Sequence, residues 1–252
     1  MRFTLSFFLI FLLFSSCSNK IEFPEKLTNR IPAENLILPD HQDYLDFRKL
    51  SAKDDFTGLQ KYVSGFKQKD QDFNLSEFEE QWNIFSGKND PAKLNANELE
   101  EWAGVTGLLF ELTGNEKYAS ELEQISQRSG SSLKEMLAPF ILTKNVDHIH
   151  VNLFQPVEIN FEHSLGGNVT VRLETDFPDS GQIRLYFGMT EQRYIELFVR
   201  IPQWAEGAKV TVKNVKYLAS PGTYCKIAKK WKEGDVVEIE FPDDRIPAYR
   251  GY

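Results

Sequence analysis

The hydrophobic pattern of this chain changes its period near residue 145. Before that point apolar residues recur at helical spacing, whereas from His148 onward apolar and polar residues alternate as in half-buried strands. About eight short alternating segments, divided by Gly, Asn, Asp and Pro turn signals, predict an antiparallel β-sandwich. The segments are Ile149–Leu153, Val157–Phe161, Val169–Leu173, Ile183–Phe187, Ile195–Val199, Val210–Val212, Cys225–Ile227 and Val236–Phe241. The fold class is therefore α+β, with a helical part followed by a sandwich.

The helical part contains several segments with their own start and stop signals. Asn95 or Asn97 can cap the clearest helix, which Gly114-Asn115 ends, and its apolar residues fall near one face. Asn74 or Ser76 can cap a helix that carries Phe78, Trp82 and Phe85 on one side. Further helices are expected from Asp54-Asp55 to Gln68, over 116–127 and over 133–140, where Pro139 would kink or end the last one.

The N-terminus has the pattern of an export signal. Arg2 precedes an apolar run from Phe3 to Phe14, which is too short to span a bilayer, and Ser15-Ser16 lead into Cys17. A small-residue pair before Cys is typical of bacterial lipoproteins, in which the Cys is acylated; an ordinary signal peptide cut nearby is the alternative. We predict a signal peptide over 1–16, a tether over 17–54, a helical part over 55–144 and the sandwich over 145–252. Acyl chains on Cys17 would make the membrane a partner and place the protein in the cell envelope, on the periplasmic side or the outer surface.

Charge and cysteine content exclude several classes of function. The net charge is −8 with no long basic run, so nucleic acid is not an expected partner. Of the two cysteines only Cys225 remains once Cys17 is acylated, and one thiol forms neither an internal disulfide nor a structural zinc site. Cys225 lies in an alternating segment, so we expect a small buried hydrophobe.

Three other groupings could carry chemistry. His148 and His150 are two apart on a strand and could share a metal with His163 or Glu162, although an exposed strand edge or ring packing is the simpler interpretation. Trp204 and Trp231 are candidate rings for stacking on a sugar, or else plug the core. Adjacent carboxylates are interpreted as solvated groups or helix caps rather than a glycosidase pair; they are Asp54-Asp55, Glu79-Glu80, Glu100-Glu101 and Asp243-Asp244.

Several motifs, in order, resemble those of one enzyme family. The pieces are EEWA at 100–103, LTGNEKYA at 112–119, HIHVNLF at 148–154, ETDFPDSGQI at 174–183, LFVRIPQWA at 197–205, GTY at 222–224 and WKEGDVVEIEFP at 231–242. Over about residues 97–242 they are similar to glycoside hydrolase family 127, the β-L-arabinofuranosidase-like enzymes. The resemblance implies the late helices of an α/α barrel followed by the sandwich. It makes the helical part here a truncated, α/α-barrel-like remnant, because fewer than a hundred residues stand where the family has several hundred.

The resemblance also implies a zinc-thiolate mechanism whose residues are largely missing. The family holds zinc with a Glu-x-Cys pair and a later Cys-Cys pair, and one thiolate of the latter is the proposed nucleophile. Here Glu100 is the only zinc-ligand position that matches, Trp102 stands at the first Cys position, and no Cys-Cys occurs. Since zinc needs these soft ligands to hold a thiol deprotonated, we expect no catalytic residues, no metal and no cofactor.

The leading hypothesis is therefore a lipid-anchored, non-catalytic relative of these hydrolases, either associated with plant or bacterial polysaccharide or a decayed gene product. Two alternatives remain open. One is an active hydrolase on arabinose-containing glycans with a rearranged site, and the other is a structural envelope module without a ligand. The capacity to bind zinc and to cleave an aryl arabinofuranoside separates the enzyme from the other two.

Overall fold

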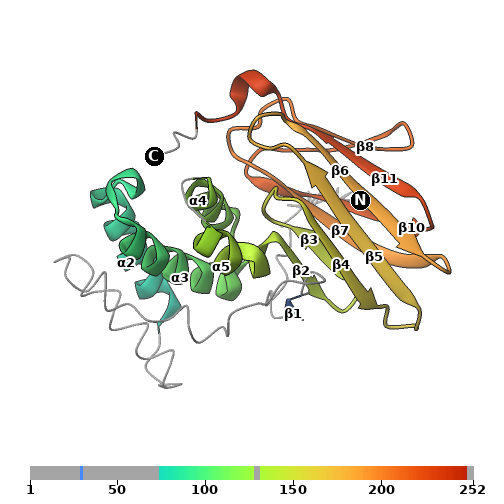
Figure 1. Cartoon of the computed structure of the whole chain (residues 1–252), viewed down its shortest axis with the longest axis horizontal. Helices are drawn as coiled ribbons and strands as arrows, with labels where there is room; N and C mark the ends of the chain where they lie inside the picture. Colours follow the sequence, from blue (N-terminus) through green and yellow to red (C-terminus); the bar gives the residue numbers. More distant parts are fainter. Residues whose placement is uncertain (1–28, 31–73, 128–130, 249–252) are drawn as a thin grey trace, which may run out of the picture.

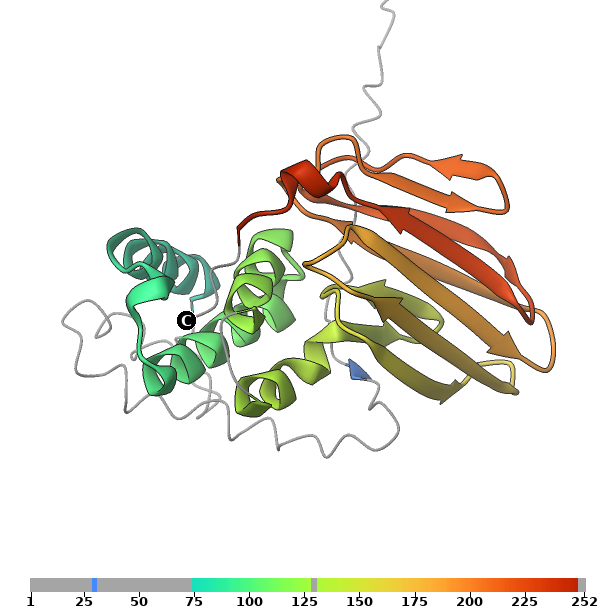
Figure 2. The ribbon, with the colours of Figure 1, turned by 45° about the horizontal axis from the view of Figure 1, so that its top comes forward.

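The computed structural model describes residues 29–30, 74–127 and 131–248. Helices precede a two-sheet sandwich and lie together on one side of it (Figures 1 and 2). This arrangement confirms the α+β prediction. The signal peptide, Cys17, Asp54-Asp55 and most of the tether lie outside the described residues. Within the described part, no helix is long and apolar enough to cross a membrane.

The helix ends follow the predicted capping chemistry. Asn74 caps α2 (Leu75–Lys88), and Asn95 forms a reciprocal capping box with Glu98 at the start of α3 (Ala96–Thr113). Gly114 ends α3 in the left-handed conformation, with φ of 63°. Asn115 then caps α4 (Glu116–Ser126). A short 3₁₀ turn, η4 (Pro91–Lys93), joins α2 to α3.

The last helix runs directly into the sandwich. Helix α5 (Ser131–Ile141) contains Pro139 and continues for two residues beyond it, and β2 (Leu142–Asn145) begins at the next residue. The β part therefore starts three residues before the predicted position 145. No turn signal separates the two elements, so the hydrophobic pattern gave no sign of β2.

The strands form two sheets. The first has the order β1-β2-β3-β7-β10, and the second β4-β5-β6-β11-β8-β9. Pairing is antiparallel except between β3 and β7, which run parallel, so the first sheet is mixed rather than wholly antiparallel. The strands are β1 (Asn29–Arg30), β3 (His148–Val151), β4 (Val157–Glu162), β5 (Asn168–Thr175), β6 (Gln182–Met189), β7 (Arg193–Ile201), β8 (Lys209–Val212), β9 (Val215–Tyr217), β10 (Thr223–Trp231) and β11 (Asp235–Glu240), followed by the 3₁₀ turn η5 (Asp243–Arg245).

The alternating residues of both sheets meet in one core. Val169, Val171 and Leu173 of β5 are buried, while the intervening positions are not. Aromatic rings join the two sheets: Phe187 on β6 stacks on Trp231 of β10 with ring centroids 4.0 Å apart. The tryptophan at the start of the WKEGD turn, Trp231, is therefore a core residue.

Candidate functional site

The position that the family resemblance assigns to a zinc-binding cysteine lies inside an aromatic cluster. Trp102 on α3 is fully buried and stacks on Trp82 with ring centroids 5.3 Å apart. The Phe85 ring packs against Trp102 with ring centroids 4.6 Å apart, and the Tyr118 ring meets Trp82 edge-on with centroids 4.9 Å apart. The four rings, which come from α2, α3 and α4, pack against one another at the position that the resemblance assigns to the thiolate.

The polar atoms of this aromatic cluster are occupied by protein partners. Trp102 Nε1 donates to Glu121 at 2.8 Å, and Trp82 Nε1 donates to Thr106 Oγ1 at 3.0 Å. Tyr118 donates its hydroxyl to Glu79 at 2.7 Å, and burial together with this carboxylate raises the pKa of Tyr118 well above its ordinary value. An indole N–H is a donor only, so Trp102 offers no lone pair to a metal. These residues do not fit the family's zinc site.

Cys225 lies far from that cluster in the sequence and in the fold. It sits on β10 in the sandwich, is 2% exposed, and is a free thiol. Burial raises the pKa of Cys225 to about 11, so the thiolate needed for nucleophilic attack is disfavoured at neutral pH. The prediction of a small buried hydrophobe is correct.

His148 and His150 both contact neighbouring side chains. His150 is buried and stacks on Phe198 at 4.6 Å, and burial first and His148 second lower its pKa to about 3. His148 is half-exposed and lies 3.4 Å from Glu196, whose carboxylate also pairs with Lys226 at 2.8 Å. The Lys226 ammonium beside this face repels a cation.

His163 uses both ring nitrogens within the protein. Its Nε2 lies 3.0 Å from the Tyr194 carbonyl oxygen, and its Nδ1 accepts from the Leu165 N–H. It is therefore not available as a third ligand beside His148 and His150. Among residues 74–127 and 131–248, no three His, Cys, Asp or Glu side chains gather as a group that could hold a metal ion.

The two tryptophans of the sandwich differ in exposure. Trp231 is fully buried, and its Nε1 donates to the Ile195 carbonyl at 3.0 Å. Its ring has no face to offer a sugar, which corrects its candidacy as a stacking platform. Trp204 is only partly buried and packs against Phe177 and Phe241 at the surface of the core. Trp204 therefore retains a partly open ring.

A buried ion cluster joins the sandwich to the helices. Arg200 lies near the C-terminal end of β7 and is fully buried. Its Nη1 donates to Glu116 at 2.9 Å and its Nη2 donates to Glu123, and both glutamates lie on α4. Its Nε donates to the Asn152 carbonyl. Burial lowers the pKa of Arg200, but Glu123 and Glu116 outweigh it, and the net pKa lies above the ordinary value. The guanidinium thus stays charged and fixes α4 on the first sheet.

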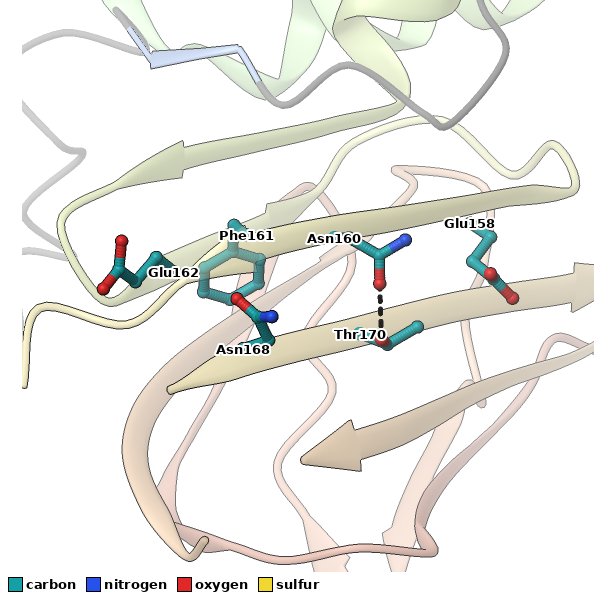
Figure 3. Close-up of a pocket in the computed structure, with 6 residues that line it drawn as sticks. All are labelled: Glu158, Asn160, Phe161, Glu162, Asn168 and Thr170. Atoms are coloured by element: carbon teal, nitrogen blue, oxygen red, sulfur yellow. Dashed lines mark hydrogen bonds between the residues drawn. The ribbon is translucent and has the colours of Figure 1, made fainter. Parts of the chain in front are cut away.

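A polar groove crosses the outer face of β4 and β5 (Figure 3). It has a volume of about 600 Å³ and is lined by Glu158, Asn160, Phe161, Glu162, Asn168 and Thr170. Asn160 and Thr170 are cross-strand partners, and the Thr170 hydroxyl donates to Asn160 Oδ1 at 2.5 Å. The sequence shows these polar residues only as the solvent-facing positions of two strands, so the alternation predicts their direction but not the hollow.

Comparisons with known proteins identify a family and several solved structures that are similar to part of this chain. Residues 148–243 match the family model described as Beta-L-arabinofuranosidase, GH127 middle domain. Similar solved structures include a GH127 β-arabinofuranosidase (21% identity, TM-score 0.50), a GH127 β-L-arabinofuranosidase from Geobacillus stearothermophilus T6 (21%, 0.48) and a glycoside hydrolase (20%, 0.49). A search of the curated proteins finds no match to this chain.

The similar region covers 57% of this chain. It covers only 31 to 32% of each of the three solved structures, so this chain spans about a third of their length. The β-arabinofuranosidase with a TM-score of 0.50 supports the fold alone. The family model lies wholly within the sandwich, from β3 to the start of η5. Residues 148–243 therefore match a GH127 middle domain, and the chain as a whole is similar to only a part of these glycoside hydrolases.

Proposed function

We propose that this protein is a non-catalytic relative of the GH127 hydrolases, anchored in the bacterial envelope through Cys17 and associated with carbohydrate. The observation that carries the non-catalytic part is the environment of Trp102. Where the family resemblance calls for a zinc-binding thiolate, the chain has a fully buried indole that packs against Trp82 and Phe85. The β-L-arabinofuranosidase activity named for the relatives has no counterpart in these side chains.

The remaining cysteine supports the same proposal. The family chemistry, as the resemblance implies it, requires a thiol whose pKa is lowered by zinc. Cys225 has its pKa raised by burial instead, and it lies in the sandwich rather than beside Glu100. This chain has no other cysteine except Cys17, which the lipoprotein pattern assigns to acylation.

Metal analysis of the purified full chain tests the non-catalytic proposal. After expression in zinc-supplemented medium and dialysis against zinc-free buffer, we expect no stoichiometric zinc. Glu100→Gln should then leave the metal content unchanged, since Glu100 is the only matched ligand position. Stoichiometric zinc that is lost in Glu100→Gln would contradict the proposal and favour the hydrolase alternative.

Anchoring is tested separately by labelling. Cells grown with a radioactive or alkynyl palmitate should label the wild-type chain and not Cys17→Ala, and the variant should move from the detergent phase to the aqueous phase. Cys225→Ala is the matched control, because this buried thiol should leave labelling intact. Label that persists in Cys17→Ala would refute acylation at this residue.

A further inference from the structure

The groove on β4 and β5 is distinct from the helical position where the family resemblance places zinc. It lies on β4 and β5 of the second sheet (Figure 3), whereas Trp102 lies on helix α3. Its volume of about 600 Å³ falls in the range of about 300 to 1,000 Å³ that is usual for small-molecule sites. It is therefore large enough to hold a ligand.

The lining side chains offer both donors and acceptors. Because Thr170 donates to Asn160 Oδ1, the two N–H groups of the Asn160 amide have no protein acceptor among the described residues. Asn168 adds a second amide, and Glu158 and Glu162 add acceptors. Each hydroxyl of a polyol both donates and accepts, so such a mixed set suits hydroxyl-rich ligands.

The charges of the groove exclude other ligand classes. Its lining contains two carboxylates and no basic side chain, and Arg172, the cross-strand partner of Glu158, is paired with Glu174, so a neutral ligand is favoured over an anion. Glu158 and Glu162 are four residues apart on β4, roughly 13 Å along a strand. The two carboxylates therefore do not converge on one point, as the ligands of a metal ion must. Instead the polar row is elongated, with Asn160 between its ends (Figure 3).

Two further features of the groove bear on ligand binding. Phe161 contributes a partly buried ring to the lining, at the rim of the polar row, and Lys144 Nζ already lies over this ring at 5.3 Å from its centroid. On the neighbouring strand β6, Gly188 stands next to Thr170, where an added Cβ would lie 3.3 Å from Thr170 Cβ. A glycine inside a strand often marks a place where a ligand approaches closely.

From these observations we infer that the β4–β5 groove binds a neutral oligosaccharide, with Asn160 and Thr170 at its centre. The inference rests on the proposed function in one respect: carbohydrate association selects a glycan among hydroxyl-rich ligands. The length of the row suits more than one sugar ring. The protein would then hold a glycan on its sandwich without cleaving it.

Affinity electrophoresis of the full chain tests the inference. Native gels would contain arabinan as the neutral glycan or sodium polygalacturonate as an anionic one. We expect retardation by arabinan and none by polygalacturonate. The double variant Asn160→Ala/Thr170→Val should weaken arabinan binding about tenfold, which corresponds to about 1.4 kcal/mol.

Thr211→Val is the matched control, because Thr211 lies outside the groove on β8 of the same sheet. Circular dichroism melting of all variants separates lost binding from lost folding. No retardation by arabinan, or retardation that the double variant leaves unchanged, would overturn the inference. Either result would leave the non-catalytic proposal standing. Stoichiometric zinc would refute that proposal but would say nothing about glycan binding in the groove.

Discussion

Arg200 Nη1 donates a hydrogen bond to Glu116 Oε1 at 2.9 Å, across 84 positions of sequence. One residue belongs to the sandwich and the other to helix α4, and both side chains are buried. With Glu123 and the Asn152 carbonyl, this contact makes helix α4 part of the environment of β7, a strand within the region that matches the GH127 middle-domain model. The two parts of the chain are therefore coupled through a buried charge.

Replacing Arg200 should destabilise the whole chain. Removing one partner of a buried ion pair leaves the others uncompensated, so Arg200→Met should lower the free energy of unfolding by about 3 to 5 kcal/mol in urea titrations. Arg172→Met is the control, since its pair with Glu174 is exposed and worth about 1 kcal/mol or less. Equal effects of the two substitutions would contradict the coupling of helices and sandwich.

The two sandwich tryptophans should respond differently to truncation. Trp231→Ala removes a fully buried ring that stacks on Phe187 and should cost about 3 to 5 kcal/mol. Trp204→Ala should cost less, because that ring is only partly buried. Chemical denaturation followed by circular dichroism measures both. A near-zero cost for Trp231→Ala would place its ring outside the core.

Asp235 should make the protein sensitive to acid. Burial raises the pKa of Asp235, but Lys213 and Lys229 outweigh it, so its folded pKa lies below the ordinary 3.8. A lowered folded pKa stabilises the fold above the unfolded pKa, and this stabilisation is lost as pH falls through the folded pKa. Asp235→Asn should therefore be less stable than wild type at pH 7, and the difference should shrink below pH about 4.

Denaturation at pH 7 and at pH 3 measures the contribution of Asp235. Asp179→Asn serves as the control, because Asp179 is exposed in a loop and should change the acid response little. A difference between wild type and Asp235→Asn that is as large at pH 3 as at pH 7 would show that the carboxylate charge does not stabilise the fold.

The sequence predicted those features of the fold that depend on local chemistry. The Asn95 cap, the Gly114 end and the alternating core residues of β5 follow from backbone and burial rules that act within a few residues. Strands β1, β2 and β9 were not predicted: β1 has two residues and lies in the predicted tether, β2 follows a helix without a turn, and β9 has only three residues. The parallel pairing of β3 with β7 is a long-range choice that no local pattern encodes.

The candidate site was less predictable for the same physical reason. An arginine in an alternating strand resembles a surface residue, and the carboxylates that allow Arg200 to be buried lie 77 and 84 positions away. The groove likewise depends on the relation of two strands: Asn160 and Thr170 meet only through the β4–β5 register. By contrast, Trp102 at a cysteine position was visible in the sequence, and the structure adds the rings that enclose it.

The most direct test of the central claim is a turnover measurement. The purified full chain, with zinc and a reducing agent present, would be incubated with an aryl β-L-arabinofuranoside and assayed for released arabinose. The non-catalytic account predicts no release above a protein-free blank, for wild type and for Cys225→Ser alike, since Cys225 is buried with a raised pKa. Release of arabinose by the wild type that is abolished by Glu100→Gln or Cys225→Ser would contradict it.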